Sequence, residues 1–115
     1  MDAVTADVVT AQLDAYNARD LERFLDCYAS EAVIEDGTGN VMMRGRDAMR
    51  ALYGQLFAQS PHLHCEIRQR IRVGQYIVDE EAITGFHLDG FPTELHAAAV
   101  YRVEGRRIAH VRLLM

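Results

Sequence analysis

The sequence has few cysteines, no long apolar run and no excess of positive charge, and each absence excludes a class of protein. Its two cysteines, Cys27 and Cys65, are too few for a disulfide framework and lack the spacing of a CxxC motif. We therefore expect both to be small core residues. No stretch approaches the ~20 apolar residues that span a bilayer, so we expect no membrane partner. The first residues, MDAVTADVV, lack a basic region followed by an apolar one, which predicts a cytoplasmic protein.

The charge balance argues against a nucleic-acid partner. The formal net charge is −5, whereas proteins that bind phosphate backbones need a basic face. Arg68, Arg70 and Arg72 do cluster, but their alternate spacing predicts one solvated or subunit-contacting face of a strand. The 115 residues are half apolar and a quarter charged, a composition that suits one globular domain spanning residues 1–115.

Helical periodicity in the first half of the chain gives way to alternation in the second half. Apolar residues recur at helical spacing in three segments, 3–18, 21–28 and 47–59. A short β-branched segment at 32–36 predicts a strand that ends in a turn. Alternating patterns predict four further strands, at 63–73, 76–87, 93–104 and 107–115. Helices followed by an antiparallel sheet indicate an α+β fold with three helices packed on one sheet face.

The alternation in the last two strands separates an inner from an outer face. Ala97, Ala99 and Tyr101 belong to the face turned toward the helices, while His96 and His110 belong to the outer face. Small side chains beneath the helices leave room. A curved sheet of this kind is therefore expected to enclose a cavity rather than a filled core.

Metal and cofactor motifs are not apparent. His62 and His64 form a pair at the start of a strand, but no third ligand lies within reach in the sequence, so chance is the simpler explanation. The sequence carries no nucleotide motif either. We therefore expect no cofactor and no metal.

Several loose motifs occur in a recognisable order along nearly the whole chain. They are Tyr16 to Asp20, the segment YASEAVIEDGTG (Tyr28 to Gly39), Arg44-Gly45-Arg46 and the final hairpin RVEGRRIAHVRLL. In this order the chain resembles the nuclear transport factor 2-like superfamily, which includes ketosteroid isomerase and the SnoaL-like polyketide cyclases. The resemblance implies a cone-shaped domain whose curved antiparallel sheet and three helices enclose a cavity for a small apolar molecule.

Ketosteroid isomerase gives the sharpest comparison. Its catalytic base falls at Asp36, and two tyrosines that support its oxyanion donor fall at Tyr28, in the predicted second helix, and at Tyr53. The oxyanion donors themselves do not match, because the tyrosine position is Gln12 and the second acid position is Ala99. Each lost donor is expected to cost ~3 kcal/mol or more of transition-state stabilisation. Steroid isomerisation by the familiar mechanism is therefore disfavoured.

Asp36 has two interpretations from the residues themselves. If Ile34 packs inward, Asp36 also points inward and Glu35 outward, and an apolar cavity should then raise the Asp36 pKa toward the range of a general base. Alternatively, Asp36 and Gly37 begin a turn in which the carboxylate accepts backbone hydrogen bonds. Both interpretations can hold together.

Two polar residues of the first helix are candidate ligand contacts. Gln12 and Tyr16 could donate to a carbonyl or hydroxyl oxygen, although Gln12 could equally be helix surface and Tyr16 core. Tyrosines at core positions commonly bury their rings while their hydroxyls find partners. The full set of predicted binding residues is Gln12, Tyr16, Tyr28, Tyr53, Met42, Ala99, Tyr101 and Val111.

Two functions from different classes follow. The first is a SnoaL-like enzyme, an isomerase, cyclase or lyase that uses Asp36 for cofactor-free proton transfer on a small apolar carbonyl or hydroxyl compound. The second is a non-catalytic ligand-binding or dimerisation domain of the same fold. In either case we expect a homodimer through the outer sheet face, because that face mixes His96, Ala98 and Val100 with charged residues.

Overall fold

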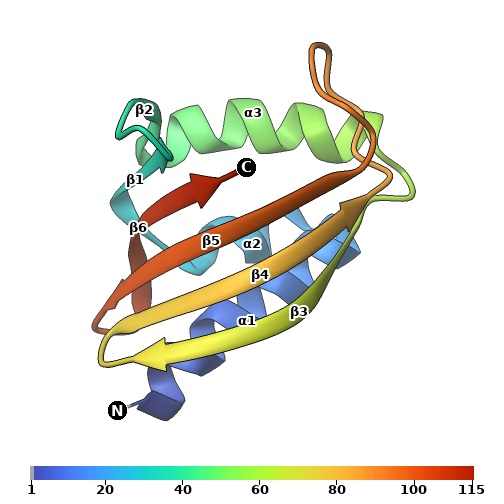
Figure 1. Ribbon diagram of the computed structural model, residues 1–115. Coiled ribbons are helices and arrows are strands. Elements are labelled where there is room, and N and C mark those ends of the chain that lie inside the picture. Colours follow the sequence, from blue (N-terminus) through green and yellow to red (C-terminus); the bar gives the residue numbers. More distant parts are fainter. Residues whose placement is uncertain (1) are drawn as a thin grey trace.

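The computed structural model describes residues 2–115, with side chains from residue 5 onward. Three helices and six strands make up this described part of the chain (Figure 1). In chain order they are α1 (Asp2–Ala18), α2 (Leu21–Asp26), β1 (Tyr28–Asp36), β2 (Val41–Arg44), α3 (Gly45–Gln59), β3 (His64–Val73), β4 (Tyr76–Thr84), β5 (Leu95–Glu104) and β6 (Arg107–Leu114).

The strands form one sheet in the order β2-β1-β6-β5-β4-β3. Neighbouring strands are antiparallel except for β1 and β6, which run parallel. The predicted antiparallel sheet is therefore confirmed for most of its pairs, and the parallel pair of β1 and β6 is the exception. Strands joined by a tight hairpin must be antiparallel, but β1 reaches β6 only through the rest of the domain, so its direction was not fixed by a local turn.

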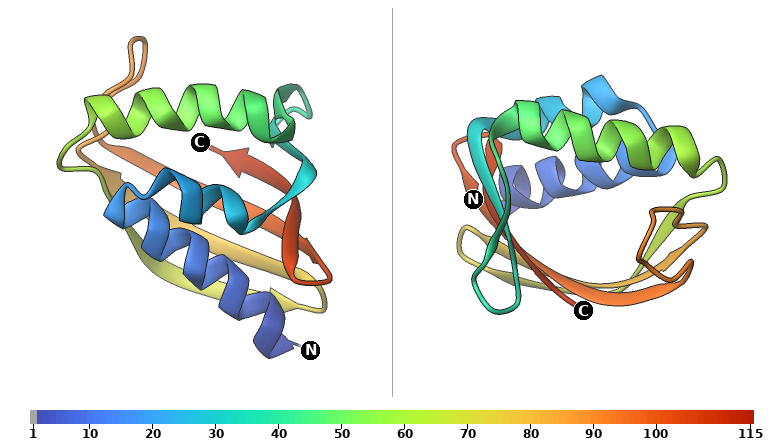
Figure 2. Two further views of the ribbon diagram at one scale, coloured as in Figure 1. Left: turned by 180° about the vertical axis from the view of Figure 1, so that it is seen from behind. Right: turned by 90° about the horizontal axis from the view of Figure 1, so that it is seen from above.

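The three helices cover one face of the curved sheet. Viewed from above, the sheet bends around the helices, and α1 and α3 lie across its hollow side (Figure 2). Helix α1 contacts β3 and β4, while α3 contacts β1 and β2. This arrangement confirms the predicted α+β domain with its helices on one sheet face.

The second helix is shorter than its apolar period suggested. The Asp20 side chain caps α2 by accepting a hydrogen bond from the Arg23 N–H, and the helix ends at Asp26. Placing Tyr28 in this helix was wrong, because Tyr28 opens β1 and pairs with Ile108 of β6. The Ile108 N–H donates to the Cys27 carbonyl at 2.8 Å. Pairing with a distant strand therefore overrode the local helical pattern.

Other boundaries differ from the predictions by a few residues. Strand β1 begins four residues before the predicted start, α3 starts at Gly45, and β4 stops at Thr84. The short strand β2, which pairs with the end of β1, was not predicted. Gly45 has a φ of 83°, a conformation that glycine adopts without strain, so it turns the chain directly from β2 into α3.

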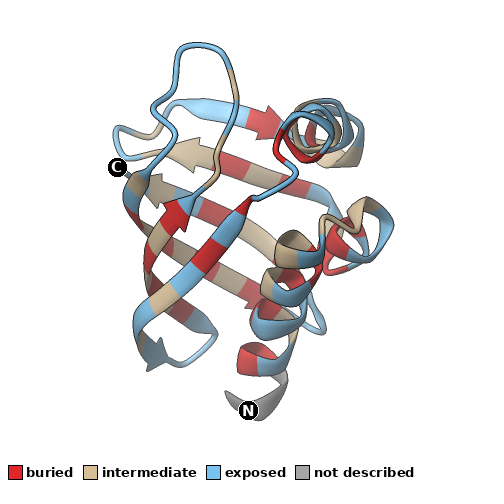
Figure 3. Cartoon of the chain, turned by 90° about the vertical axis from the view of Figure 1, so that its right-hand side faces the viewer, coloured by how far each residue is buried: buried red, intermediate tan, exposed pale blue. Residues whose placement is uncertain are grey.

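The core lies between the helices and the sheet, and burial alternates along the strands that face it (Figure 3). Cys27 and Cys65 are both buried, as expected of core residues. The largest fully buried side chains are Phe24, Leu25, Ile34, Met49, Leu56, Leu63, Ile77 and Ile108. Each removes apolar surface worth ~1.5–3 kcal/mol from water, so this layer holds the helices on the sheet.

A β-bulge reverses the expected faces of the second half of β3. The pairing of β3 with β4 shifts register between Ile67 and Gln69. Arg70, predicted on the outer face, instead pairs with the buried Asp79, while Ile71 and Val73 are 55% and 60% exposed. One extra residue in a strand moves every following side chain to the opposite face, which explains the error.

The outer sheet face carries both charges and small apolar side chains, as predicted. The His96 ring contacts Glu80 at 2.7 Å, and Glu80 also accepts from Gln69. We expect the protein to be a homodimer in solution through this face, as measured by light scattering at micromolar concentration. Val100→Arg should shift the mass toward the monomer, because it adds a charge among the half-buried side chains of β5.

Ala51→Arg is the matched control, since Ala51 is exposed on α3, away from the sheet. A monomer for the unmodified protein, or equal effects of the two variants, would contradict the predicted interface.

Candidate functional site

A cavity of about 100 Å³ lies between the helices and the inner face of the sheet. Side chains from all three helices and all six strands of the described chain line it. Met42, Phe91 and Met115 line it and are also exposed to solvent, so they mark its mouth. An engineered cavity of ~150 Å³ can hold benzene, so this space suits a small ligand.

Glu81 is the carboxylate of this cavity. Inward-facing residues of β4 alternate as Ile77, Asp79, Glu81 and Ile83, all of them buried. Glu81 is only 5% exposed, and it lines the cavity. Burial raises the pKa of its carboxyl group to about 7, helped by the nearby negative charge of Asp79. A carboxyl group with this pKa exchanges protons readily at neutral pH.

Asp79 is buried too, but it has a cationic partner. Both Asp79 carboxylate oxygens accept from Arg70, at 2.6 and 2.9 Å, and Arg70 also donates to the Thr10 hydroxyl of α1 at 2.8 Å. The bulge in β3 brings Arg70 to this position. In the described lining of the cavity there is no arginine, lysine or histidine. Glu81 is therefore the acid of this pair that remains available to a ligand.

A chain of hydrogen bonds holds one oxygen of Glu81. The Tyr28 hydroxyl donates to Gln12 Oε1 at 3.1 Å, and Gln12 Nε2 donates to the Tyr101 hydroxyl oxygen at 3.1 Å. The Tyr101 hydroxyl in turn donates to Glu81 Oε2 at 3.3 Å. This last bond favours the ionised carboxylate and partly offsets its burial.

Two further tyrosines belong to the cavity wall. Tyr16 and Tyr53 both line it, with their rings 6.5 Å apart in an edge-on arrangement. Burial raises the pKa of both hydroxyls, and the Glu81 charge raises them further, so both remain protonated donors at neutral pH. Within the described residues neither hydroxyl bonds to another protein group. Because no fully buried side-chain polar atom in this part of the chain lacks a partner, each of these hydroxyls keeps some accessible surface. They are therefore open to a ligand.

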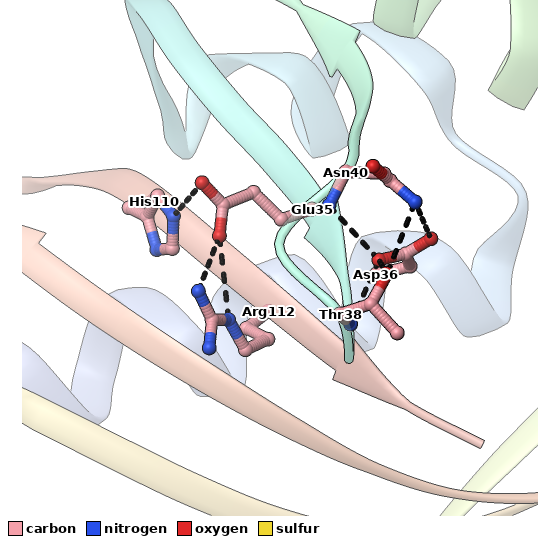
Figure 4. A network of polar contacts seen from close by, with 6 residues as sticks. All are labelled: Glu35, Asp36, Thr38, Asn40, His110 and Arg112. Atoms are coloured by element: carbon pink, nitrogen blue, oxygen red, sulfur yellow. Dashed lines mark hydrogen bonds and ion pairs between the residues drawn. The ribbon is translucent and has the colours of Figure 1, made fainter.

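Asp36 makes its hydrogen bonds within the turn that follows β1. Its Oδ1 accepts from the Thr38 N–H, the Thr38 hydroxyl and the Asn40 N–H at 2.7–3.0 Å (Figure 4). These hydrogen bonds, led by the one from the Thr38 side chain, hold the pKa of Asp36 below its usual value. Of the two interpretations of Asp36, the hydrogen bonds agree with the turn and not with an inward carboxylate of raised pKa, because the turn offers several donors and the carboxylate folds back onto them. Asp36 is a turn residue that lies outside the cavity lining.

The neighbouring acid points to the outer face, as predicted. Glu35 accepts from Arg112 at 2.8 Å and contacts the His110 ring at 3.3 Å (Figure 4). Hydrogen bonds from these two side chains, Arg112 first, lower the Glu35 pKa. His110 and His96 both lie on the outer face, and no group of metal-ligating side chains is present in the described chain.

The structure brings most of the predicted binding residues together. Those that line the cavity are Gln12, Tyr16, Tyr28, Met42, Tyr53, Tyr101 and Val111. Ala99 is fully buried in the core and is not part of the lining, while its neighbour Ala97 is.

Glu81 was not among the site residues predicted from the sequence. The signal that could have found it is the alternation of Asp79 and Glu81 with Ile77 and Ile83, which puts two acids on the inner face of one strand.

Comparisons with known proteins agree with this architecture. The family model of a SnoaL-like domain matches residues 9–111. No curated protein gives a significant match.

Among solved structures, an uncharacterised cystatin-fold protein from Novosphingobium aromaticivorans is 28% identical, with a TM-score of 0.86 over 96% of this chain and 97% of that one. A putative polyketide cyclase from Sinorhizobium meliloti is 18% identical, with a TM-score of 0.75 over 93% of each chain. A protein with a ketosteroid isomerase-like fold from Catenulispora acidiphila, in complex with trimethylamine, is 22% identical, with a TM-score of 0.72 over 92% of this chain and 82% of that one.

The family model covers most of the chain, and the helices, sheet and cavity agree with it. The chain therefore belongs to the SnoaL-like domain family, and it shares its fold with a protein described as NTF2-like from Cytophaga hutchinsonii.

Proposed function

We propose that the protein binds a small, largely apolar carbonyl or hydroxyl compound and catalyses proton transfer on it without a cofactor. Glu81 is the general acid and base, a role that the sequence resemblance gave to Asp36. The observation that carries the proposal is the buried Glu81 carboxylate with a pKa of about 7 in the wall of an apolar cavity.

The two free tyrosine hydroxyls support this chemistry. When a base removes a proton from a carbon next to a carbonyl group, negative charge develops on the carbonyl oxygen. The Tyr16 and Tyr53 hydroxyls are protonated donors in the same cavity and could hydrogen-bond that oxygen. They would take the place of the donors lost at Gln12 and Ala99.

A second candidate function is binding of a small amine without catalysis. Glu81 has no cationic partner in the described lining of the cavity, and several aromatic side chains line the same cavity. Ionised carboxylates and aromatic faces both attract cations. The relative from Catenulispora acidiphila, whose structure contains trimethylamine, further supports this candidate.

The proton-transfer proposal predicts an effect confined to Glu81. Glu81→Gln should slow exchange of α protons in a panel of small ketones in heavy water, followed by NMR, by about 10²-fold or more, because the base is lost. The rate of the unmodified protein should rise with pH up to about 7 and then level off. Asp36→Asn is the matched control and should leave the rate within a few-fold. Loss of exchange in Asp36→Asn alone would return the role of base to Asp36.

The raised Glu81 pKa also predicts a pH-dependent stability. The folded protein binds the Glu81 proton more tightly than the unfolded chain, so stability from this site is complete below pH 4.5 and is lost as pH rises through 7. The free energy of unfolding in urea should be measured for Glu81→Gln and the unmodified protein. As pH rises from 4.5 to 7, the unmodified protein should lose roughly 3 kcal/mol relative to Glu81→Gln, which has no proton to lose at this position. A difference that stays constant with pH would contradict the burial of an ionisable group here.

The amine candidate predicts selection by charge. Choline and dimethylbutanol, the neutral compound in which carbon replaces nitrogen, have nearly the same shape. Calorimetry at pH 8, where Glu81 is ionised, should give choline about tenfold tighter binding or more. Glu81→Gln should remove this preference. Equal affinities for the two compounds in the unmodified protein would exclude the amine candidate.

A further inference from the structure

Gln12 lies at the centre of the buried hydrogen-bond chain that ends on Glu81. It joins Tyr28 of β1 to Tyr101 of β5, while Glu81 lies on β4 and Gln12 itself on α1. Gln12, Tyr28 and Tyr101 are all at least 95% buried. The amide accepts hydrogen bonds at Oε1 and donates them from Nε2. The hydroxyl that donates to Oε1 therefore fixes which other hydroxyl receives a hydrogen bond from Nε2.

The Tyr28 end sets the direction of this chain. Within the described residues, Gln12 Oε1 is the acceptor of the Tyr28 hydroxyl. If the amide were rotated by half a turn, Nε2 would face Tyr28, and the Tyr28 hydroxyl hydrogen would lose its acceptor. A buried donor without an acceptor is unfavourable, so one orientation of the amide is favoured.

The direction at Gln12 decides what Tyr101 does. Since Gln12 Nε2 donates to the Tyr101 oxygen, the hydroxyl hydrogen of Tyr101 is left to donate to Glu81 Oε2. That bond occupies Oε2 whether Glu81 is ionised or protonated. Glu81 Oε1 makes no hydrogen bond within the described chain and is the oxygen left for the cavity.

We infer that Gln12 is a positioning residue, which fixes the direction of the hydrogen-bond chain so that Glu81 Oε2 is held and Oε1 exchanges protons with the ligand. The consequence for catalysis rests on the proposed function. The direction of the hydrogen-bond chain does not rest on the proposed function, because it follows from contacts within the protein.

Other charged and titratable groups act on Glu81 from the elements around it. Asp79 of β4 disfavours its ionisation, and Arg70 of β3 favours it. The remaining groups influenced by the Glu81 charge are Tyr16, Tyr28, Tyr53, Cys65 and Tyr101. A test must therefore separate the chain through Gln12 from effects of packing and charge.

A double-mutant cycle read by the Glu81 pKa makes this separation. The pKa is measured by carboxyl carbon NMR in the ligand-free protein. Tyr28→Phe should raise it by about 0.3, because the freed amide gains a second orientation that only the protonated acid tolerates. In a Gln12→Met background the same change should have no effect, since the chain is already broken. Tyr101→Phe, which removes the last bond, should raise the pKa by about one unit in the unmodified background.

Tyr53→Phe is the control for the cycle, because Tyr53 lines the cavity outside the chain. Its effect on the Glu81 pKa should be the same with and without Gln12→Met. Should Gln12→Met fail to fold, Tyr101→Phe provides a second background in which Tyr28→Phe should be silent.

An equal effect of Tyr28→Phe in both backgrounds, or none in the unmodified protein, would overturn the inference. These readouts need no turnover, so they separate a failure of this inference from a failure of the proposed reaction.

Discussion

The central constraint in this structure is that polar groups inside an apolar interior must find partners there. Glu81, Tyr101, Gln12 and Tyr28 meet this constraint together, since each bonds to the next across four different elements. An unpaired buried polar group costs about twice what a satisfied hydrogen bond contributes, so this chain ties α1 to three strands in one arrangement.

Two acids of β4, Asp79 and Glu81, lie in the same region and differ in their partners. Asp79 is neutralised by Arg70, whereas Glu81 receives only a hydroxyl hydrogen bond and remains open on its other oxygen. Environment alone makes one carboxylate structural and the other chemically available, although they are two residues apart. The bulge in β3 produces this difference, because it turns Arg70 inward to reach Asp79 but not the cavity.

Asp36 illustrates how far a family resemblance extends. The resemblance predicts a catalytic base at this residue, yet its carboxylate accepts hydrogen bonds from Thr38 and Asn40. A family can keep a fold and a cavity while the residue that carries the chemistry changes, because function depends on a site and not on the fold that holds it. Here the inner face of β4 offers the acid that the turn after β1 does not.

The sequence by itself determined the fold class, the three helices, five of the six described strands and most of the cavity wall. Periodicity is a local property, and the positions of Gln12, Tyr16, Tyr53 and Val111 follow from it once helices and strands are recognised. Only the tertiary structure decided the parallel pairing of β1 with β6, the bulge that turns Arg70 inward, and that Glu81 rather than Asp36 lines the cavity. Strand pairing and register depend on contacts between distant residues, and the pKa of an acid depends on what surrounds it after folding.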